Sequence, residues 1–397
     1  MKPKRLSLLL IFAFVCSLLP FSASAAEEKS VSGGVKIGLI RGDIVYFAGK
    51  DEPMAWRVLD AEKTNTEDDS GFLLLSDSVS CSASHASSSY YGMHSECESF
   101  FADYFASPYH DAAMTVSCDD PTYVFSGDEM GGGLKDDRIF ALSAAEAEKL
   151  TAEEKEFNTS WWLRTGYLQK RTVFGWHDAD FLYVNKGDGS FHDIKPGPYT
   201  SILLRPAVNL KKSAVDIRIS DTESAPLLLP SGDKTASDGK FAAYENTGAW
   251  SLCMRDENVS ITKAYTDGSP ETVLRAYVST SVESPTDSDY IAFVLRKENG
   301  DIAYYARVKQ ENTDGYYTLA LPSDVDWTND SLYVFHETDK DGFSSLVTDF
   351  TELCLTHDFG KGESVSETEH RITCSACGYF ENVRHTIEYA LSDDETH

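Results

Sequence analysis

The stretch DYIAFVLRKENGDIAYYARVKQ, residues 289–310, decides the fold of the second half of the chain. Two apolar runs flank Asn299-Gly300, and Asn-Gly between alternating apolar runs is a strong signal for a tight β-hairpin. On either side, further strand patterns recur with no helix pattern between them, namely TVLRAYVSTS (272–281), YYTLALP (316–322) and SLYVFHET (331–338). Strands at such regular spacing predict a β-sandwich of immunoglobulin-like architecture over residues 241–353, which we expect to fold without the rest of the chain.

Upstream, residues 37–211 mix strand and helix patterns. Short apolar runs predict strands, and the clearest are GDIVYFAG (42–49), AWRVLD (55–60), GFLLLS (71–76), SWWLRTG (160–166), ADFLYVNKGDGSFHD (179–193, a hairpin) and SILLRPAVNLK (201–211). Ser143 and Glu146 have the spacing of a capping box and predict a helix, and aromatic residues at helical spacing predict another over 97–109. The pattern indicates an α+β head at 37–211, followed by a polar linker at 212–240.

Residues 1–25, MKPKRLSLLLIFAFVCSLLPFSASA, have the layout of a secretory signal peptide, with a basic start, an apolar run and a small-x-small end. We therefore expect a secreted or cell-surface protein with no transmembrane segment after the signal is cleaved. The chain of 397 residues carries a formal net charge of −29, which repels nucleic acid and argues against it as a partner. Removing the signal leaves an odd number of cysteines, so a disulfide-dense scaffold is not expected.

The candidate ligand-binding side chains of the head lie between residues 161 and 205. Trp161 and Trp162 are adjacent, so a strand directs them to opposite faces. We favour two core or rim aromatics, because tryptophan is highly buried on average, and the functional alternative is that one of the two is exposed as a stacking platform for a sugar. Arg164 and Arg205 would pair with a carboxylate, either as ligand contacts or, more commonly in proteins, as structural ion pairs.

In this order, the segments AWRVLD, DRIFALSAAEAEKL (137–150), WWLRTG, LYVNKGDGS (182–190) and LLRPAVNL (203–210) resemble an uncharacterised domain of exported bacterial proteins, chiefly Gram-positive. That domain is catalogued as a domain of unknown function and is distantly similar to the C-type-lectin-like fold of the formylglycine-generating enzymes. The resemblance covers about residues 40–211 and implies a C-type-lectin-like head. Residues 248–337 resemble the β-rich module that often follows it, and the tail resembles a short His/Cys repeat at the ends of surface proteins.

Two classes of function fit this organisation. The first is a non-catalytic extracellular binding or adhesion protein whose ligand is a glycan, the cell wall or another protein. The alternative is an extracellular enzyme on the lectin-like head, distantly related to formylglycine-generating enzymes. Those enzymes use a cysteine pair with copper, and no such pair is assigned among Cys81, Cys97 and Cys118, because none lies near the WWLRTG or LLRPAV segments in sequence.

Two further readings concern the hairpin of the head. A hydrolase would draw on polar residues that flank it, namely His177, Asp178, Asp180, His192 and Asp193. A calcium-dependent lectin would draw on the oxygens of Asn185, Asp188 and Asp193, which are fewer than the six to eight that calcium takes. Polar residues around a hairpin are commonly solvated, so both interpretations are less favoured than a non-catalytic binding protein.

The tail, residues 354–397, is predicted to be a small His/Cys module or a disordered tail, because it is too short and polar to build a core of its own without a staple. A Cys-x2-Cys pair among further cysteines and histidines supplies thiolates and imidazoles, which suit tetrahedral zinc. The predicted ligands are His357, Cys374 and Cys377, with Cys354, His370 or His385 as the fourth. The rival is a disulfide from Cys374 to Cys354 or Cys377, because exported chains are oxidised.

Overall fold

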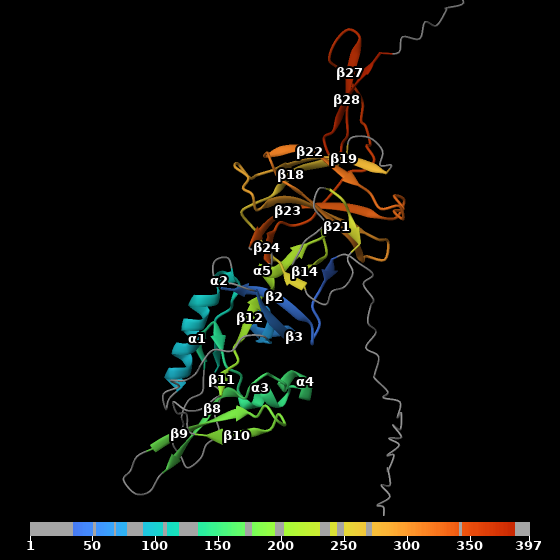
Figure 1. Ribbon diagram of the computed structural model, residues 1–397. Coiled ribbons are helices and arrows are strands. Elements are labelled where there is room, and N and C mark those ends of the chain that lie inside the picture. The colour runs from blue at the N-terminus through green and yellow to red at the C-terminus, as the bar shows by residue number, and fades with distance from the viewer. Residues whose placement is uncertain are drawn as a thin grey trace, which may run out of the picture. The chain divides into compact units, whose positions relative to one another are not determined.

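The computed structural model describes residues 35–50, 53–66, 69–77, 90–105, 109–118, 134–170, 177–194, 202–230, 239–243, 250–266, 272–340 and 344–385. These residues belong to one compact unit and are mostly β-strand, arranged in several sheets with short helices (Figure 1). The chain therefore combines strands and helices, as the α+β prediction requires, with strands in the majority. No helix within these ranges is long and apolar enough to cross a membrane.

The largest sheet, here called the head sheet, has nine strands and is antiparallel except where β16 runs parallel to β2. In spatial order its strands are β1 (Lys36–Ile37), β14 (Ser224–Pro230), β16 (Trp250–Leu252), β2 (Ile44–Gly49), β3 (Pro53–Thr66), β4 (Asp69–Ser76), β12 (Ala207–Lys211) and β7 (Ile139–Phe140), with β13 (Asp216–Arg218) paired to β14.

Helices and a smaller sheet accompany the head sheet. The helices are α1 (Tyr90–Tyr104), α2 (Tyr109–Ala112), α3 (Ala144–Glu148) and α4 (Ala152–Lys155). Capping boxes begin α3 at Ser143, as predicted, and α4 at Thr151. The aromatic helix α1 begins earlier than the predicted residue 97. The four-stranded side sheet has the order β10 (Phe191–Ile194), β9 (His177–Val184), β8 (Trp161–Lys170) and β11 (Leu203–Leu204), and β5 (Val116–Cys118) pairs with β6 (Leu134–Asp137).

Both faces of the head sheet are buried, which explains why its strands read as nearly continuous apolar runs. On β4, Phe72 and Leu74 face a core that includes α1, whereas Leu73 and Leu75 face a second core that includes α3. The alternation of a strand therefore persists, but neither side is left to solvent.

The predicted linker at 212–240 is wrong over its first part. Residues 212–230 form α5 (Lys212–Val215), β13 and β14, and β14 lies in the same sheet as β2 (Figure 1). The run Leu227-Leu228-Leu229 is at most 1% exposed, because both sides of β14 are covered. Polar and Pro-rich flanks hid this short apolar strand from sequence reasoning. Residues 231–238 lie outside the described ranges.

The opening stretch forms the predicted hairpin. β20 (Asp289–Arg296) pairs antiparallel with β21 (Ile302–Lys309), and Gly300 at the turn has φ +87°, a backbone conformation that glycine adopts readily. These strands belong to the seven-stranded central sheet, in the order β15 (Ala242–Ala243), β21, β20, β23 (Ser331–Lys340), β24 (Ser344–Val347) and β17 (Met254–Arg255), with β25 (Thr351–Glu352) paired to β23. The outer sheet has the order β18 (Ile261–Thr266), β19 (Val273–Thr280) and β22 (Asp314–Ala320), and the tail sheet has β26 (Glu363–Ser364), β27 (Glu369–Thr373) and β28 (Phe380–Arg384).

The central sheet is also buried on both faces. Ile291, Phe293 and Leu295 of β20 pack with residues of the outer sheet, whereas Ala292 and Val294 lie in a different core. That second core is shared with residues far upstream in the sequence, which are Val35, Ile217, Ile219, Leu227 and Leu229. The sandwich therefore does not supply both of its own apolar faces, contrary to the expectation that residues 241–353 are self-sufficient.

A buried histidine on β23 makes stability depend on pH. His336 is 1% exposed, and its Nε2 lies 3.5 Å from Asp289 Oδ1. Burial lowers the pKa of His336 below its ordinary 6.5, although the charges of Asp289, Asp256 and Glu337 oppose that shift. The folded protein therefore holds a neutral imidazole where the unfolded chain would take up a proton.

We expect the free energy of unfolding to fall as the pH drops below about 6.5, because the unfolded state then binds the extra proton. The stabilisation from the neutral His336 is fully present above the pKa of the unfolded chain. As the pH falls towards the pKa of the folded protein, it is lost by no more than about 1.4 kcal/mol per pH unit. Urea unfolding at several pH values measures the slope. The matched variant His336→Leu should flatten it, and an unchanged slope in that variant would assign the effect to other groups.

Candidate metal centre

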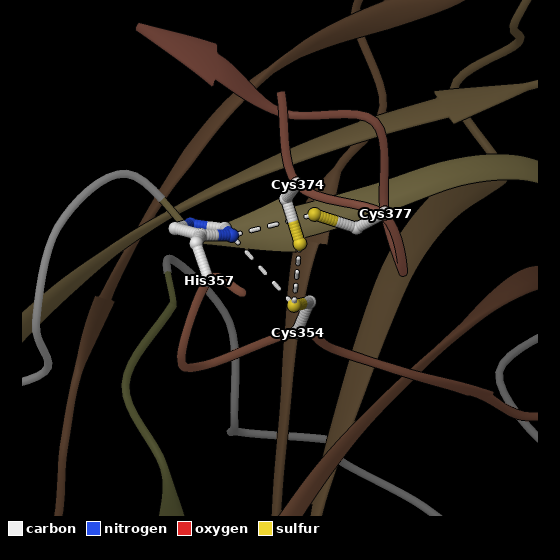
Figure 2. A group of neighbouring side chains, drawn as sticks. All are labelled: Cys354, His357, Cys374 and Cys377. Carbon is white, nitrogen blue, oxygen red and sulfur yellow. Dashed lines mark hydrogen bonds between the residues drawn. The ribbon is translucent and has the colours of Figure 1, made fainter. Parts of the chain in front are cut away.

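Four side chains of the second half converge on one point. Cys354 and His357 lie in the loop after β25, and Cys374 and Cys377 lie in the turn between β27 and β28 (Figure 2). One ligand-type atom from each of the four lies within 4.8 Å of all the others. Sequence reasoning named all four as candidates.

The distances match a tetrahedral metal site. His357 Nδ1 lies 3.6 Å from Cys354 Sγ and 3.4 Å from Cys377 Sγ, and Cys354 Sγ lies 3.9 Å from Cys374 Sγ. A tetrahedron with metal–sulfur bonds of about 2.3 Å and a metal–nitrogen bond of about 2.0 Å has edges of roughly 3.5–3.8 Å. Three of the six distances thus come close to the edges of a tetrahedral site, and the other three are at most 4.8 Å.

The turn that carries two of the cysteines is closed by its own backbone. Cys374 N–H donates to Tyr379 O at 2.7 Å, and Gly378 N–H donates to Cys374 O at 3.0 Å. Gly378 has φ +71°, so a glycine here spares the strain that a side chain would bring. Hydrogen bonds outside the ligand set therefore hold both thiols in position.

His357 is oriented by a hydrogen bond on its far side. Its Nε2 lies 2.9 Å from Thr266 O, a carbonyl that can only accept, so Nε2 carries the proton. Nδ1 then keeps a free lone pair aimed at the sulfur atoms, which is the arrangement metal-binding histidines use. The ring also stacks on Tyr379, with centroids 4.4 Å apart, so packing restrains its rotation.

The ligand loop is anchored to the outer sheet. Cys354 forms a parallel bridge with Tyr265, and the backbone N–H and hydroxyl of Thr266 both donate to Cys354 O. Thr266 thus contacts Cys354 through its N–H and hydroxyl groups, and it contacts His357 through its carbonyl oxygen. The geometry of the centre is tied to β18 as well as to the tail.

Electrostatics distinguishes the three thiols. Burial opposes ionisation of Cys374, but the backbone N–H groups of Cys377 and Ala376, together with His357, outweigh it and lower the pKa of Cys374 to about 6. Burial, followed by the neighbouring cysteines, raises the pKa of Cys354 to about 12, and burial also raises the pKa of Cys377. Without a cation, only one of three clustered thiols ionises readily, and a bound divalent cation would favour the other thiolates.

The register of the tail sheet shows which of the three candidates for the fourth ligand lies near the other three residues. His370 pairs with Val383 in the hairpin of β27 and β28, while the Cys374–Cys377 turn lies at the other end of that hairpin. Four residues along a strand span about 13 Å, so His370 is too far from the cysteines. His385 stacks on His370, with centroids 5.3 Å apart, so neither histidine belongs to the group, and Cys354 is its fourth member.

The rival disulfide is not formed in this structure. Cys354, Cys374 and Cys377 are free thiols, and 3.9 Å between Cys354 Sγ and Cys374 Sγ far exceeds a bond of about 2.0 Å. Elsewhere, Cys97 and Cys253 are buried, Cys81 lies outside the described residues, and the side chain of Cys118 is not described.

Both tryptophans lie in the core of the head, as the favoured interpretation predicts, and the alternative of a sugar-stacking platform is wrong. Trp161 and Trp162 point to opposite faces of β8, as adjacent strand residues must, but each is 0% exposed. Trp161 packs in the core beside α3, and Trp162 packs in the core beside α1. Because β8 is covered on both sides, neither indole presents a face to a ligand.

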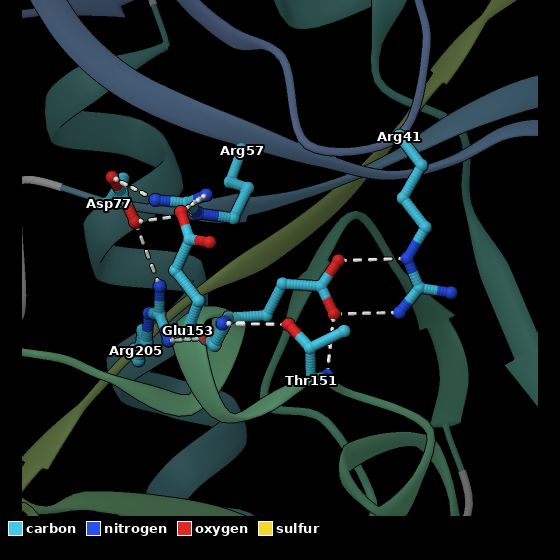
Figure 3. Close-up of polar contacts among 7 residues, drawn as sticks. Arg41, Arg57, Asp77, Thr151, Glu153 and Arg205 are labelled. Carbon is cyan, nitrogen blue, oxygen red and sulfur yellow. Dashed lines mark hydrogen bonds and ion pairs between the residues drawn. The ribbon is translucent and has the colours of Figure 1, made fainter. Parts of the chain in front are cut away.

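The two candidate arginines, Arg164 and Arg205, make contacts inside the fold. Arg205 is 0% exposed and donates to Ser76 O at 2.7 Å. It also donates to Glu154 O at 2.7 Å and to Asp77 Oδ1 at 3.0 Å (Figure 3). Burial lowers its pKa to about 10, partly offset by Asp77, so it stays protonated at neutral pH. Arg164 is also buried and donates to Ala141 O, so its guanidinium binds the protein's own backbone and not a ligand.

Two further salt bridges lie near Arg205. Arg57 pairs with the same Asp77, and Arg41 forms two hydrogen bonds of 2.8 and 2.7 Å with Glu154 (Figure 3). The hydrogen bond from Arg41 is the largest cause that lowers the pKa of Glu154. The first pair joins β3 to the turn after β4, and the second joins the turn before β2 to the capped helix α4, so both link separate parts of the head.

The hairpin residues do not converge on a site. Asn185 Oδ1 and Asp188 Oδ1 accept hydrogen bonds from the backbone of Gly187 and Ser190, which are the contacts of an ordinary turn. His192 and Asp193 are exposed on β10. The side chains of His177, Asp178 and Asp180 lie outside the described part of the chain. Where side chains are described, this hairpin supports neither the hydrolase nor the calcium reading.

A second group of ligand-type side chains was missed. His94 and Glu98 lie one helical turn apart on α1, close to Asp137 of β6. The i, i+4 spacing of a histidine and a glutamate was the available sequence signal. Asp137 hydrogen-bonds directly to His94, and Glu98 is exposed, so we assign no ligand to this group.

Comparisons with known proteins add little to this geometry. No protein-family model matches the chain, and no curated protein matches it. Among solved structures, the chain is similar to an FMN-binding beta-glucuronidase from Facaelibacterium prausnitzii L2-6, with 8% sequence identity and a TM-score of 0.18. The match covers 83% of this chain and 40% of the enzyme, and so low a TM-score carries no argument about fold or activity.

Proposed function

We propose that this chain is an exported, non-catalytic binding protein whose C-terminal part is fixed by a structural zinc ion. The observation that carries the metal is the Cys3His set of Cys354, His357, Cys374 and Cys377. In structural zinc sites the protein fills all four positions, whereas catalytic sites leave one open. Four protein ligands at tetrahedral spacing therefore favour a role in folding over one in catalysis.

Location and ligand class belong to the same proposal. The signal-like start and the acidic composition support a secreted or surface-associated protein that binds a glycan, the cell wall or another protein. Two sheets packed face to face over one core support an immunoglobulin-like sandwich, and the ordered motifs of residues 40–211 support a C-type-lectin-like head. The metal staples a tail sheet whose residues are mostly exposed.

Protein purified without a His tag is expected to contain about one zinc ion per chain, as measured by elemental mass spectrometry. Cys377→Ser should lose the ion, because it removes one of four ligands and serine is a poor ligand for zinc. The matched control His385→Ala should keep it, since His385 lies at the far end of the hairpin.

Two results would contradict the metal. Zinc-free protein in which thiol titration finds the tail cysteines oxidised would leave a disulfide-stapled tail. Equal zinc in wild type and Cys377→Ser would place the ion elsewhere in the chain. Detection of the mature chain only inside the producing cells would contradict export, independently of the zinc measurement.

A further inference from the structure

We infer that the cleft between the outer sheet and the metal-binding loops is the ligand-binding site of this protein, and that its ligand is an uncharged oligosaccharide. This inference rests on the proposed binding function, to which it gives a place and a ligand class.

The cleft has the size of a ligand site. Its volume is about 600 Å³, within the roughly 300–1,000 Å³ typical of small-molecule pockets. Residues 261–264 of β18, 327–331 and 351–353 line it, and the ligand loops supply 354–356 and 376–377. The cleft is therefore bounded in part by the segments that meet at the metal centre.

An accessible tryptophan lines this cleft, unlike the two in the head. Trp327 is half-buried, packs against the core between the central and outer sheets, and still contributes to the lining. The C–H face of a pyranose ring is apolar and flat, so it gains by covering an indole ring in the way that other apolar surfaces do. Trp327 thus offers a sugar ring the stacking surface that Trp161 and Trp162 do not.

The polar lining complements hydroxyl groups. Most of its polar side chains are neutral hydroxyls and an amide, which both donate and accept hydrogen bonds. They are Thr262, Thr328, Asn329, Ser331, Thr351 and Thr356. A groove for an apolar peptide would instead show large aliphatic side chains, and only Ile261, Leu353 and Leu355 fill that role here.

The charges of the lining favour an uncharged ligand. Asp330 is 8% exposed and is neutralised by Lys297 at 2.9 Å, so it does not face the ligand as a free carboxylate. Lys263 and Glu352 remain, and they have opposite signs. The formal net charge of −29 further disfavours acidic polysaccharides, whose approach it would oppose.

The metal centre shapes this cleft. Cys354 and Cys377 belong both to the ligand set and to the cleft lining, as do the residues beside them. Loss of the ion would loosen the wall formed by the two loops, because it removes the link between their cysteine and histidine side chains and leaves only backbone hydrogen bonds and ring contacts to join them. Binding of the saccharide should consequently depend on zinc although no saccharide atom needs to touch it.

The test uses the full zinc-loaded chain and four soluble probes, namely cellotetraose, chitotetraose, mannotetraose and xylotetraose, in titration calorimetry. Wild type should bind at least one of them. Trp327→Ala should weaken that binding by about tenfold or more, as loss of an aromatic anchor does. The matched control Phe380→Ala, which removes an aromatic residue that is 48% exposed outside the cleft, should bind like wild type.

A second variant guards against a folding defect in Trp327→Ala. Thr328 is exposed, so Thr328→Arg should fold normally and obstruct the cleft, which should again reduce binding about tenfold or more. Full-strength binding by both variants overturns the inference, as does wild type that binds none of the probes. If wild type still sediments with cell walls or captures a surface protein in that case, the proposed binding function stands without the cleft. If it does neither, both fall.

Discussion

A chain cut to residues 241–353 is expected to show no cooperative thermal transition. The cut exposes the face of the central sheet that carries Ala292, Val294, Phe335 and Val347, all 0% exposed in the intact chain. Exposing a large buried side chain costs about 1.5–3 kcal/mol, so several together exceed a typical domain stability of roughly 5–15 kcal/mol. The fragment should bind a hydrophobic dye and aggregate, measured by circular dichroism and light scattering.

A longer fragment provides the control for that experiment. Residues 212–353 restore β13 and β14, with Ile217, Leu227 and Leu229, over the exposed face. This fragment should regain β-sheet signal and a measurable melting transition. A fragment 241–353 that melts as cooperatively as the full chain would show that the shared core is dispensable.

Replacing Arg205 by alanine is expected to cost about 3–5 kcal/mol of unfolding free energy, the penalty for breaking a buried ion pair. The substitution leaves the carbonyls of Ser76 and Glu154 without their buried donor. It also empties the space over the Phe157 and Trp161 rings, whose centroids lie 4.6 and 5.3 Å from the guanidinium carbon. Urea unfolding of the purified variant measures the loss.

The control is an arginine with little burial. The Arg218 side chain is 63% exposed and lies 3.9 Å from Asp349, so Arg218→Ala should change stability by less than about 1 kcal/mol. Arg205→Lys should recover only part of the loss, because one ammonium group cannot reproduce three hydrogen bonds made by a planar guanidinium. Equal effects for Arg205→Ala and Arg218→Ala would rule out the buried network as a source of stability.

The sequence predicts the structure correctly where that structure depends on residues close together along the chain. The hairpin at 289–310 and the capping box at Ser143 follow from turn and cap chemistry within a few residues. The cysteine pair at 374–377 likewise faces one point because of a tight, self-bonded turn.

The errors concern properties that depend on distant segments. Alternation placed Trp161 and Trp162 on opposite faces correctly, but only the packing of α1 and α3 determines that both faces are covered. The choice of Cys354 over His370 depends on the register of β27 with β28, which spacing along the chain does not contain. Trp327 was overlooked because its place beside a cleft is created by loops 25–50 residues further along the chain.

The edges of the two large sheets bear on how the protein behaves at high concentration. β1 and β7 end the head sheet, and β15 and β17 end the central sheet, and each of these four strands has two residues. A long edge strand offers a row of unpaired N–H and C=O groups on which another copy can add a strand, whereas a two-residue edge offers almost none. The long apolar strands of these two sheets lie inside them, so the two large sheets present little template for the addition of a strand from another copy.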